Sequence, residues 1–278
     1  MDDPTGIVKP AMNPYETVFM SGTASGLVLL FGLFALLWLA SLAVRDASLV
    51  DRFWGAAFVA LAWWYAVLGG VPRPLAARVL LGLVTAWGLR LSLYLTWRNW
   101  GRGEDYRYAE MRRRHGARFG LISLGTVFLL QAVLAWVIAM PLYAGLALGV
   151  PQPGRAGLLW LGLAAWLVGF GFEAVGDAQL ARHRAEPSRR GTVLDTGLWR
   201  YTRHPNYFGD ALAWWGHWLV AASLGAGWTV FAPLLMTFLL MRVSGVTLLE
   251  RKLVDTRPAY RDYAARTNAF FPGPPRPS

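Results

Sequence analysis

The chain has 278 residues, of which 55% are hydrophobic and 15% are charged, and its formal net charge is +11. A soluble domain carries nearer a quarter charged residues, so the composition indicates long apolar segments in a lipid environment. The basic residues lie in short segments between apolar runs, which argues against nucleic-acid binding and favours membrane orientation or an anionic ligand. The absence of cysteine excludes disulfides, thiolate metal sites and a cysteine nucleophile.

Seven apolar runs follow one another along the chain, and each is near the roughly 20 residues that a helix needs to cross the hydrocarbon core. Backbone groups in lipid must be satisfied within their own segment, so these runs predict helices. The expected fold is therefore an all-α polytopic membrane protein, built as a single domain over residues 1–278. The runs are 17–43, 53–70, 75–97, 120–149, 156–180, 207–226 and 228–249. Pro141 and Pro233 are expected to kink the fourth and seventh runs.

Lysine and arginine are distributed unevenly among the segments between these runs. The segments 44–52, 98–119, 181–206 and 250–278 hold 2, 7, 6 and 6 basic residues, which is 21 of the 27 in the chain. With seven spans, all four segments fall on one side of the membrane. The positive-inside rule then predicts that the N-terminus lies outside and the C-terminus inside. The acidic N-terminus and the length of the first run favour an uncleaved first span over a signal peptide.

The densest polar cluster opens the sixth run and reads Arg200-Tyr201-Thr202-Arg203-His204-Pro205-Asn206-Tyr207-Phe208-Gly209-Asp210. Pro205 suits the first turn of a helix. Asn206, Asp210 and Trp214 then recur at helical spacing, with His217 close to the same face. An amide, a carboxylate and an indole on one face can hold a polar heterocycle. The alternative interpretation is polar contact between helices, with a tryptophan at the interface.

Two carboxylates end the fifth run, and two arginines follow them. Glu173 and Asp177 are four residues apart and therefore lie on one side of the expected helix. With Arg182 and Arg184 they can form a structural ion network. Alternatively, the acids accept hydrogen bonds from a ligand's hydroxyl or amide groups while the arginines hold phosphate.

Segment 98–119 contains seven arginines, beginning with Arg98 beside Asn99. Part of this charge reflects membrane orientation and attraction to anionic lipid. Arginine is also the better residue for bidentate phosphate contacts. Three arginine-rich segments and the basic tail can therefore surround a polyanionic ligand such as a dinucleotide phosphate.

Further ionisable groups lie at the same end of the other runs. Arg90 and Tyr94 are four residues apart in the third run, and Asp51 precedes the second. A buried neutral carboxyl group and a phenol can together donate hydrogen bonds to a carbonyl. The alternative is that Asp51 caps a helix and pairs with a loop arginine.

The seventh run and the tail contribute the last candidate residues. Arg242 lies inside the apolar run, Glu250 closes it, and Arg261 follows between Tyr260 and Tyr263. The tyrosines and Arg261 can also be interfacial anchors. The four histidines form no ligand pair at helical spacing, so no metal site is expected.

The segment Arg203-His204-Pro205-Asn206-Tyr207-Phe208-Gly209-Asp210 resembles the signature of the steroid 5α-reductase family and its sterol-reductase relatives. The elements that resemble its bacterial branch are Asp51…Trp54-Gly55, Arg98-Asn99…Gly101 and Leu248-Leu249-Glu250-Arg251…Arg257-Pro258…Tyr260…Tyr263…Phe270…Pro272. The likeness covers most of the chain and is most specific from about 170 to 272.

This resemblance implies seven spans, a cytoplasmic NADPH site formed by about 98–119 and 170–272, and reduction of a carbon–carbon double bond conjugated to a ketone. In such families, residues at the positions of Asn206 and Asp210 hold the nicotinamide region. The other cofactor-binding residues expected are Arg98, Asn99, Glu173, Asp177, Arg184, Tyr201, His204, Trp214, Arg242, Glu250 and Arg261. Asp51 and Tyr94 are the nearest matches to the acid and tyrosine that address the ketone, and Trp87 is an alternative occupant of the tyrosine position.

The implied reaction is hydride transfer from NADPH to the β-carbon of an apolar enone such as a Δ4-3-ketosteroid, with the enolate oxygen stabilised by hydrogen bonds. The expected partners are this apolar substrate and membrane lipids, in a monomer of the bacterial inner membrane whose cofactor site faces the cytoplasm. One alternative is a membrane methyltransferase of the isoprenylcysteine type, which shares an Arg-His-Pro-x-Tyr element and uses S-adenosylmethionine. Another is a non-enzymatic lipid-binding protein.

Overall fold

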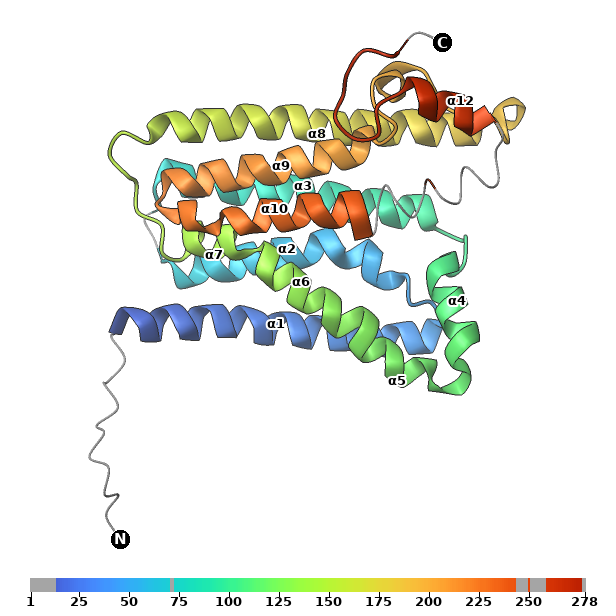
Figure 1. Cartoon of the computed structure of the whole chain (residues 1–278). Coiled ribbons are helices and arrows are strands. Elements are labelled where there is room, and N and C mark those ends of the chain that lie inside the picture. Colours follow the sequence, from blue (N-terminus) through green and yellow to red (C-terminus); the bar gives the residue numbers. More distant parts are fainter. Residues whose placement is uncertain (1–13, 71–72, 244–249, 251–258, 277–278) are drawn as a thin grey trace, which may run out of the picture.

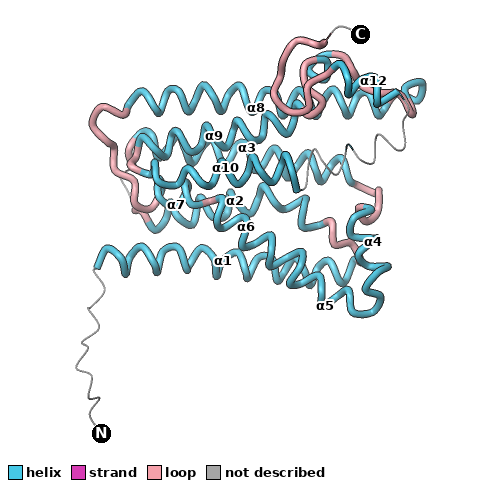
Figure 2. Tube along the Cα trace, viewed as in Figure 1, coloured by secondary structure: helices cyan, strands magenta, loops and turns pink. Residues whose placement is uncertain are grey.

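The computed structural model describes residues 14–70, 73–243, 250 and 259–276, and all regular structure in these ranges is helical. The long helices lie alongside one another (Figure 1), and the loops lie mainly at the two ends of the bundle (Figure 2). The helices are α1 (Pro14–Val44), α2 (Leu49–Leu68), α3 (Leu75–Asn99), α4 (Tyr106–His115), α5 (Phe119–Ser123), α6 (Leu130–Ile138), α7 (Met140–Leu146), α8 (Ala156–Ala185), α9 (Pro205–Ser223), α10 (Phe231–Phe238) and α12 (Ala259–Arg266).

Among the described residues, five helical segments are long and apolar enough to cross a membrane. They are Met20–Val44, Leu75–Asn99, Tyr106–Ile138, Ala156–Ala185 and Ala226–Val243. The chain is therefore an all-α integral membrane protein. The second and sixth apolar runs form α2 and α9, which lie among these segments (Figure 1). The end of the seventh run, residues 244–249, and the tail elements Arg251 and Arg257-Pro258 lie outside the described residues.

Both expected proline kinks are present. The helix breaks at Ala139, where ψ is 1°, and restarts as α7 with Pro141 in its first turn. Thr229 likewise departs from helical geometry, with ψ of 15°, and it lies four residues before Pro233. Proline has no N–H to donate to the carbonyl four residues earlier, and its ring crowds that carbonyl. These breaks divide the fourth and seventh runs into shorter helical pieces.

Glycines bring α8 and α9 into backbone contact along their length. A Cβ added to Gly209 would lie 2.5 Å from the carbonyl oxygen of Gly169, and one added to Gly216 would lie 2.8 Å from that of Gly162. Each helix repeats its glycine after seven residues, so these contacts form one continuous seam. Small residues are the usual means of close helix packing in a membrane. The seam fixes the register at which the polar ends of α8 and α9 face each other.

Aromatic side chains fill the space beside this seam. The ring of Trp214 on α9 packs edge-on against Phe58 of α2 at 4.7 Å and Trp87 of α3 at 5.4 Å between centroids. The Trp166 indole of α8 donates a 3.0 Å hydrogen bond to Nε2 of His217. Four helices therefore meet in a buried aromatic layer, one turn further into the bundle than Asp210.

The C-terminal segment folds back onto the loop that precedes α9. The backbone N–H of Arg203 donates to the Asn268 carbonyl at 2.9 Å, and that of Gly273 donates to Tyr201 at 3.0 Å. The Thr202 hydroxyl donates to the Phe270 carbonyl at 2.8 Å. Figure 1 shows α12 and the tail lying over the C-terminal part of α8. These three hydrogen bonds make the loop and the tail one wall at this end of the bundle.

Candidate functional site

A buried polar cluster joins α3, α8 and α9. Arg90 of α3 lies 2.6 Å from the Glu173 carboxylate and 2.5 Å from that of Asp177, both on α8. The Asn206 amide on α9 donates to Asp177 at 3.1 Å, and the Trp87 indole donates to Glu173 at 3.1 Å. Glu173 and Asp177 are only 3% and 4% exposed. Because buried charges are stable only when paired and hydrogen-bonded, each contact in this cluster depends on the others.

The ion network expected at Glu173 and Asp177 is present, but its arginine comes from another helix. Arg182 and Arg184 follow the two acids in the sequence, yet within the described structure neither forms an ion pair with them. Arg182 and Arg184 are exposed on either side of the buried His183, and Arg184 lines a cleft. The guanidinium of Arg90 reaches the acids instead, from the neighbouring helix.

Two of the buried polar atoms on α9 that have no hydrogen-bond partner among the described residues lie near this cluster. They are Oδ1 of Asp210 and Nε1 of Trp214, which lie one helical turn apart. A buried polar group without a partner costs about 1–3 kcal/mol. Asp210 also adds a third carboxyl group beside Glu173 and Asp177, close to the single guanidinium of Arg90. An acceptor and a donor are thus available here to a ligand or to water.

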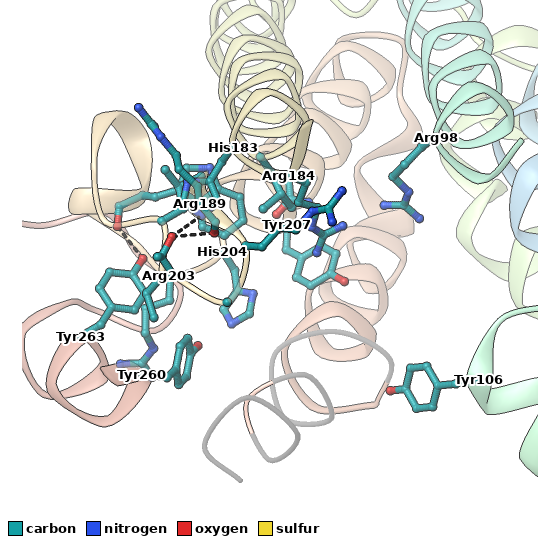
Figure 3. Close-up of a pocket in the computed structure, with 18 of the residues that line it drawn as sticks. Arg98, Tyr106, His183, Arg184, Arg189, Arg203, His204, Tyr207, Tyr260 and Tyr263 are labelled. Carbon is teal, nitrogen blue, oxygen red and sulfur yellow. Dashed lines mark hydrogen bonds between the residues drawn. The ribbon is translucent and has the colours of Figure 1, made fainter. Parts of the chain in front are cut away.

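A cleft of about 630 Å³ opens directly beside this cluster, within the usual range for a small-molecule site. Asn206 belongs to both, since its side chain bonds to Asp177 and the residue lines the cleft. Figure 3 shows Arg184 and Tyr207 facing Arg98 across the space. The arginines that line the cleft are Arg98, Arg102, Arg107, Arg184, Arg189, Arg190 and Arg203.

The cleft has an excess of positive charge. In the part of the chain that the structure describes, Arg98, Arg102 and Arg190 lie beyond ion-pair distance of any carboxylate. Arg107 is paired with Asp51 at 2.7 Å. The side chain of His204 stacks on Tyr207, with their centroids 5.5 Å apart, and gives the cleft a flat aromatic surface. This combination suits a ligand that carries both phosphate groups and a planar ring.

Glu250 binds the loop before α9 through Arg203 and His204. Its two oxygens accept from the Arg203 guanidinium at 2.7 and 3.0 Å, and Nε2 of His204 lies 3.2 Å away. Burial pushes the pKa of Glu250 upward, but hydrogen bonds from His204 and Arg203 outweigh it, so the net pKa lies below the usual value. The remaining guanidinium nitrogen of Arg203 donates to two tail carbonyls, those of Ala264 and Thr267. Glu250 and Arg203 therefore hold the walls of the cleft together.

The structure separates the two residues expected to address a ketone. Asp51 accepts hydrogen bonds from Arg107 at 2.7 Å and from the Tyr108 hydroxyl at 2.9 Å. Tyr94 instead donates to the backbone carbonyl of Asp177 at 3.3 Å. Tyr94 faces α8, whereas Asp51 faces α4, so the phenol beside Asp51 is Tyr108. Asp51 does pair with an arginine, but Arg107 lies on α4 rather than in a loop, and the N-cap residue of α2 is Ser48.

The apolar runs predict no helix within segment 98–119, so Tyr108 is not among the expected site residues. Residues Tyr106–His115 form α4, and the side chain of Asp105 caps it by accepting from the backbone N–H of Arg107 at 3.0 Å. An aspartate directly before Tyr-Arg-Tyr is a typical helix start. That signal was available in the sequence, and it would have placed Tyr108 on a helix face.

The remaining expected residues fall into two groups. Arg98, Asn99, Arg184, His204 and Asn206 line the cleft. The residues that do not line it are Tyr201, Trp214, Arg242 and Arg261. Arg242 and Arg261 are exposed, Trp214 lies in the aromatic layer, and Tyr201 contacts the tail through its carbonyl.

Comparison with known proteins places the chain in a family. Residues 37–267, which include all the candidate site residues, match the family described as "Protein of unknown function (DUF1295)", and the chain belongs to this family of membrane proteins. It is 27% identical over 274 residues to "Uncharacterized protein C594.04c" of Schizosaccharomyces pombe (strain 972 / ATCC 24843). That alignment covers 89% of this chain and 78% of the yeast protein. No solved structure matches the chain significantly.

Proposed function

We propose that the chain is an NADPH-dependent reductase that saturates a carbon–carbon double bond conjugated to the ketone of an apolar enone, such as a Δ4-3-ketosteroid. The observation that carries this proposal is the position of Asn206, where the buried amide–carboxyl cluster meets the arginine-lined cleft. A reduced nicotinamide nucleotide is divided in a matching way, because an uncharged amide-bearing ring lies at one end and the charged phosphates lie further along. The resemblance of segment 203–210 to the steroid 5α-reductase signature supports the same assignment.

The residues present fit such a cofactor at three points. The unpaired Oδ1 of Asp210 and the Asn206 side chain offer an acceptor and an amide for the ring carboxamide. Arg98, Arg102 and Arg190 offer guanidinium groups for the phosphates, including a 2′-phosphate. When bound, the cofactor supplies the hydride, and the protein supplies its orientation and the local electrostatics.

The substrate ketone requires hydrogen-bond donors where negative charge develops on its oxygen. Tyr94 is suited to this role because its hydroxyl lies beside the Asp177 backbone and makes one long contact of 3.3 Å. Arg90 lies over the Tyr94 ring at 5.1 Å and keeps positive charge near the phenol. Asp51 acts through Tyr108, whose hydroxyl it holds at 2.9 Å. Tyr94 thus stabilises the enolate oxygen, and Asp51 positions the second phenol.

The topology proposed with this function has seven spans, with α2 and α9 added to the five longer segments. The N-terminus lies outside and the C-terminus lies inside a bacterial inner membrane, and the protein acts as a monomer. Residues from 98–119, 181–206 and 259–276 line the cleft, and these parts of the chain belong to the strongly basic segments. The positive-inside rule then orients the cleft to the cytoplasm, where NADPH is available.

A membrane methyltransferase is the second candidate, because Arg203-His204-Pro205, Tyr207 and Glu250 also fit that class and cluster in space. S-adenosylmethionine carries a positive sulfonium group and lacks phosphate. An arginine-lined cleft in which three guanidinium groups lie beyond ion-pair distance of any described carboxylate favours the phosphorylated nucleotide instead.

Binding of the two cofactors to purified protein separates these candidates. We expect NADPH to quench tryptophan fluorescence and to be oxidised with at least one member of a panel of Δ4-3-ketosteroids and simpler enones. Tight binding of labelled S-adenosylmethionine without NADPH binding would support the methyltransferase and defeat the reductase.

The Asp210→Ala variant tests the residue assignment. Loss of a buried hydrogen-bond acceptor is expected to weaken NADPH binding by roughly 10- to 100-fold. The matched control is Asp195→Ala, which removes an exposed carboxylate outside the arginine-lined cleft. Equal NADPH affinity in both variants would favour a non-enzymatic lipid-binding protein.

A further inference from the structure

A second cleft, of about 610 Å³, lies between the loop before α9 and the folded-back tail. Its basic side chains are Arg200 from the loop, Arg266 from the end of α12 and Arg276 from the tail. Asp195 is the only carboxylate among its described lining residues. The cleft is separated from the arginine-lined cleft by Tyr263, which borders both and whose hydroxyl donates to the Trp199 carbonyl at 2.5 Å.

The charges in this second cleft are poorly compensated. Arg266 and Asp195 are 3.7 Å apart and are 44% and 48% exposed, so their interaction is weak. Within the described ranges, Arg200 and Arg276 form no ion pair and both are exposed. Two guanidinium groups that line this cleft therefore lack an anionic partner among the described residues.

Backbone contacts hold these arginines in place. The N–H of Arg276 donates to the Arg266 carbonyl at 2.8 Å, and Gly273 is tied to Tyr201 at 3.0 Å. The tail therefore returns to α12 and closes the cleft with ordered chain. A site whose backbone is already ordered loses less entropy when it binds a ligand.

Exposed aromatic side chains next to the cleft indicate the level of the membrane surface. Tyr201 follows Arg200 and is 45% exposed, and Phe271 in the tail is 63% exposed. Aromatic residues of this kind are enriched where the bilayer meets water, at the depth of the lipid headgroups. A phosphate that reaches Arg200 at this level belongs to a lipid more readily than to a free metabolite.

We propose that this second cleft binds the phosphate of an anionic phospholipid headgroup, with Arg200 and Arg276 as its main contacts. The guanidinium groups hold the phosphate oxygens by charge-assisted hydrogen bonds, and Phe271 contacts the start of the acyl chains. The lipid would pin the tail to the membrane.

The test compares lipids of matched acyl chains added to the full-length protein in a nonionic detergent. Bound lipid is measured by native mass spectrometry, and the melting temperature is measured in parallel. We expect phosphatidylglycerol to bind about tenfold more tightly than phosphatidylcholine. The double variant R200Q/R276Q should lose this preference. The control R113Q/R114Q removes the same charge from the exposed side of α4 and should retain it.

Three outcomes would overturn the proposal. The first is an unchanged lipid preference in R200Q/R276Q, or an equal loss in R113Q/R114Q. The second is displacement of phosphatidylglycerol by excess inorganic phosphate, which would identify a site for free anions. The third is a fall in NADPH affinity equal to the fall in lipid affinity, which would make the second cleft part of the nucleotide site. The proposal stands if R200Q/R276Q binds NADPH normally, so it can fail or hold independently of the proposed function.

Discussion

The two halves of the candidate site differ in how far their charged side chains are paired with other side chains of the protein. In the membrane half, Arg90, Glu173, Asp177 and Asn206 satisfy one another at 2.5 to 3.1 Å. In the cleft half, Arg98 and its neighbours face open space with few carboxylates. A fixed cluster is suited to orienting a reacting group, and an open basic cleft is suited to attracting an anion. Substitutions that break the paired cluster of the membrane half should therefore lower the stability of the folded protein. Substitutions in the cleft half should instead lower its affinity for the ligand.

The Arg90→Gln variant should show the largest effect on the membrane half. It leaves Glu173 and Asp177 buried without their cation, and removal of one partner of a buried ion pair costs about 3–5 kcal/mol. Thermal unfolding in detergent measures the loss. The control Arg182→Gln removes an exposed arginine from α8 and should leave the melting temperature nearly unchanged. Equal stability of the two variants would mean that the membrane half is not held by this pair.

The Gly209→Ala variant tests whether the glycine seam holds the cluster in register. The added Cβ would overlap the backbone of α8 near Gly169, and overpacking of this kind costs about 1–3 kcal/mol. Displacement of α9 would also move Asn206 away from Asp177. Gly171→Ala is the matched control, because nothing lies within 4 Å of its Cβ. If Gly209→Ala were as stable as Gly171→Ala, α8 and α9 would not be in backbone contact.

The sequence predicted the helices better than the contacts between them, and the polar cluster shows why. Apolar length and Pro205 were enough to place α9, whose first residue is Pro205. Helical spacing reveals neighbours within one helix, but Arg90 is 83 residues from Glu173. Which of the 27 basic residues reaches the acid depends on how α3 packs against α8. A single sequence does not contain that information in any local pattern.

The ketone-facing residues illustrate the same limit. Asp51 was identified as a candidate, but its phenol partner is Tyr108, which is 57 residues away and lies on a short polar helix. Arg203 and Glu250 were both part of the family resemblance, yet only the folded tail shows that they form a pair. Residue types were thus predictable near the site, whereas partners were not.

A pH dependence is expected where the tail meets the loop before α9. The folded-state pKa of Glu250 lies below its unfolded value of about 4.3, because His204 and Arg203 favour the carboxylate despite burial. The ion pair therefore contributes its full stability above about pH 4.3, and this contribution is lost as the pH falls through the folded pKa. The Glu250→Gln variant should be about 1–2 kcal/mol less stable at neutral pH, with a difference that shrinks in acid. A difference that stays constant with pH would contradict this account.

The smallest expected effect concerns single arginines in the cleft half. Arg102→Gln should weaken NADPH binding only about threefold, because exposed charge pairs contribute about 0.2–1 kcal/mol each. The affinity of this variant should also fall less steeply with added salt than that of the parent protein, since one screened interaction is missing. Titrations at several ionic strengths measure both quantities, and Arg113→Gln is the control because it lies outside the cleft. A loss of a hundredfold or more would show that Arg102 is held in a desolvated contact. The contrast between a fixed membrane half and an open cleft half would then fail.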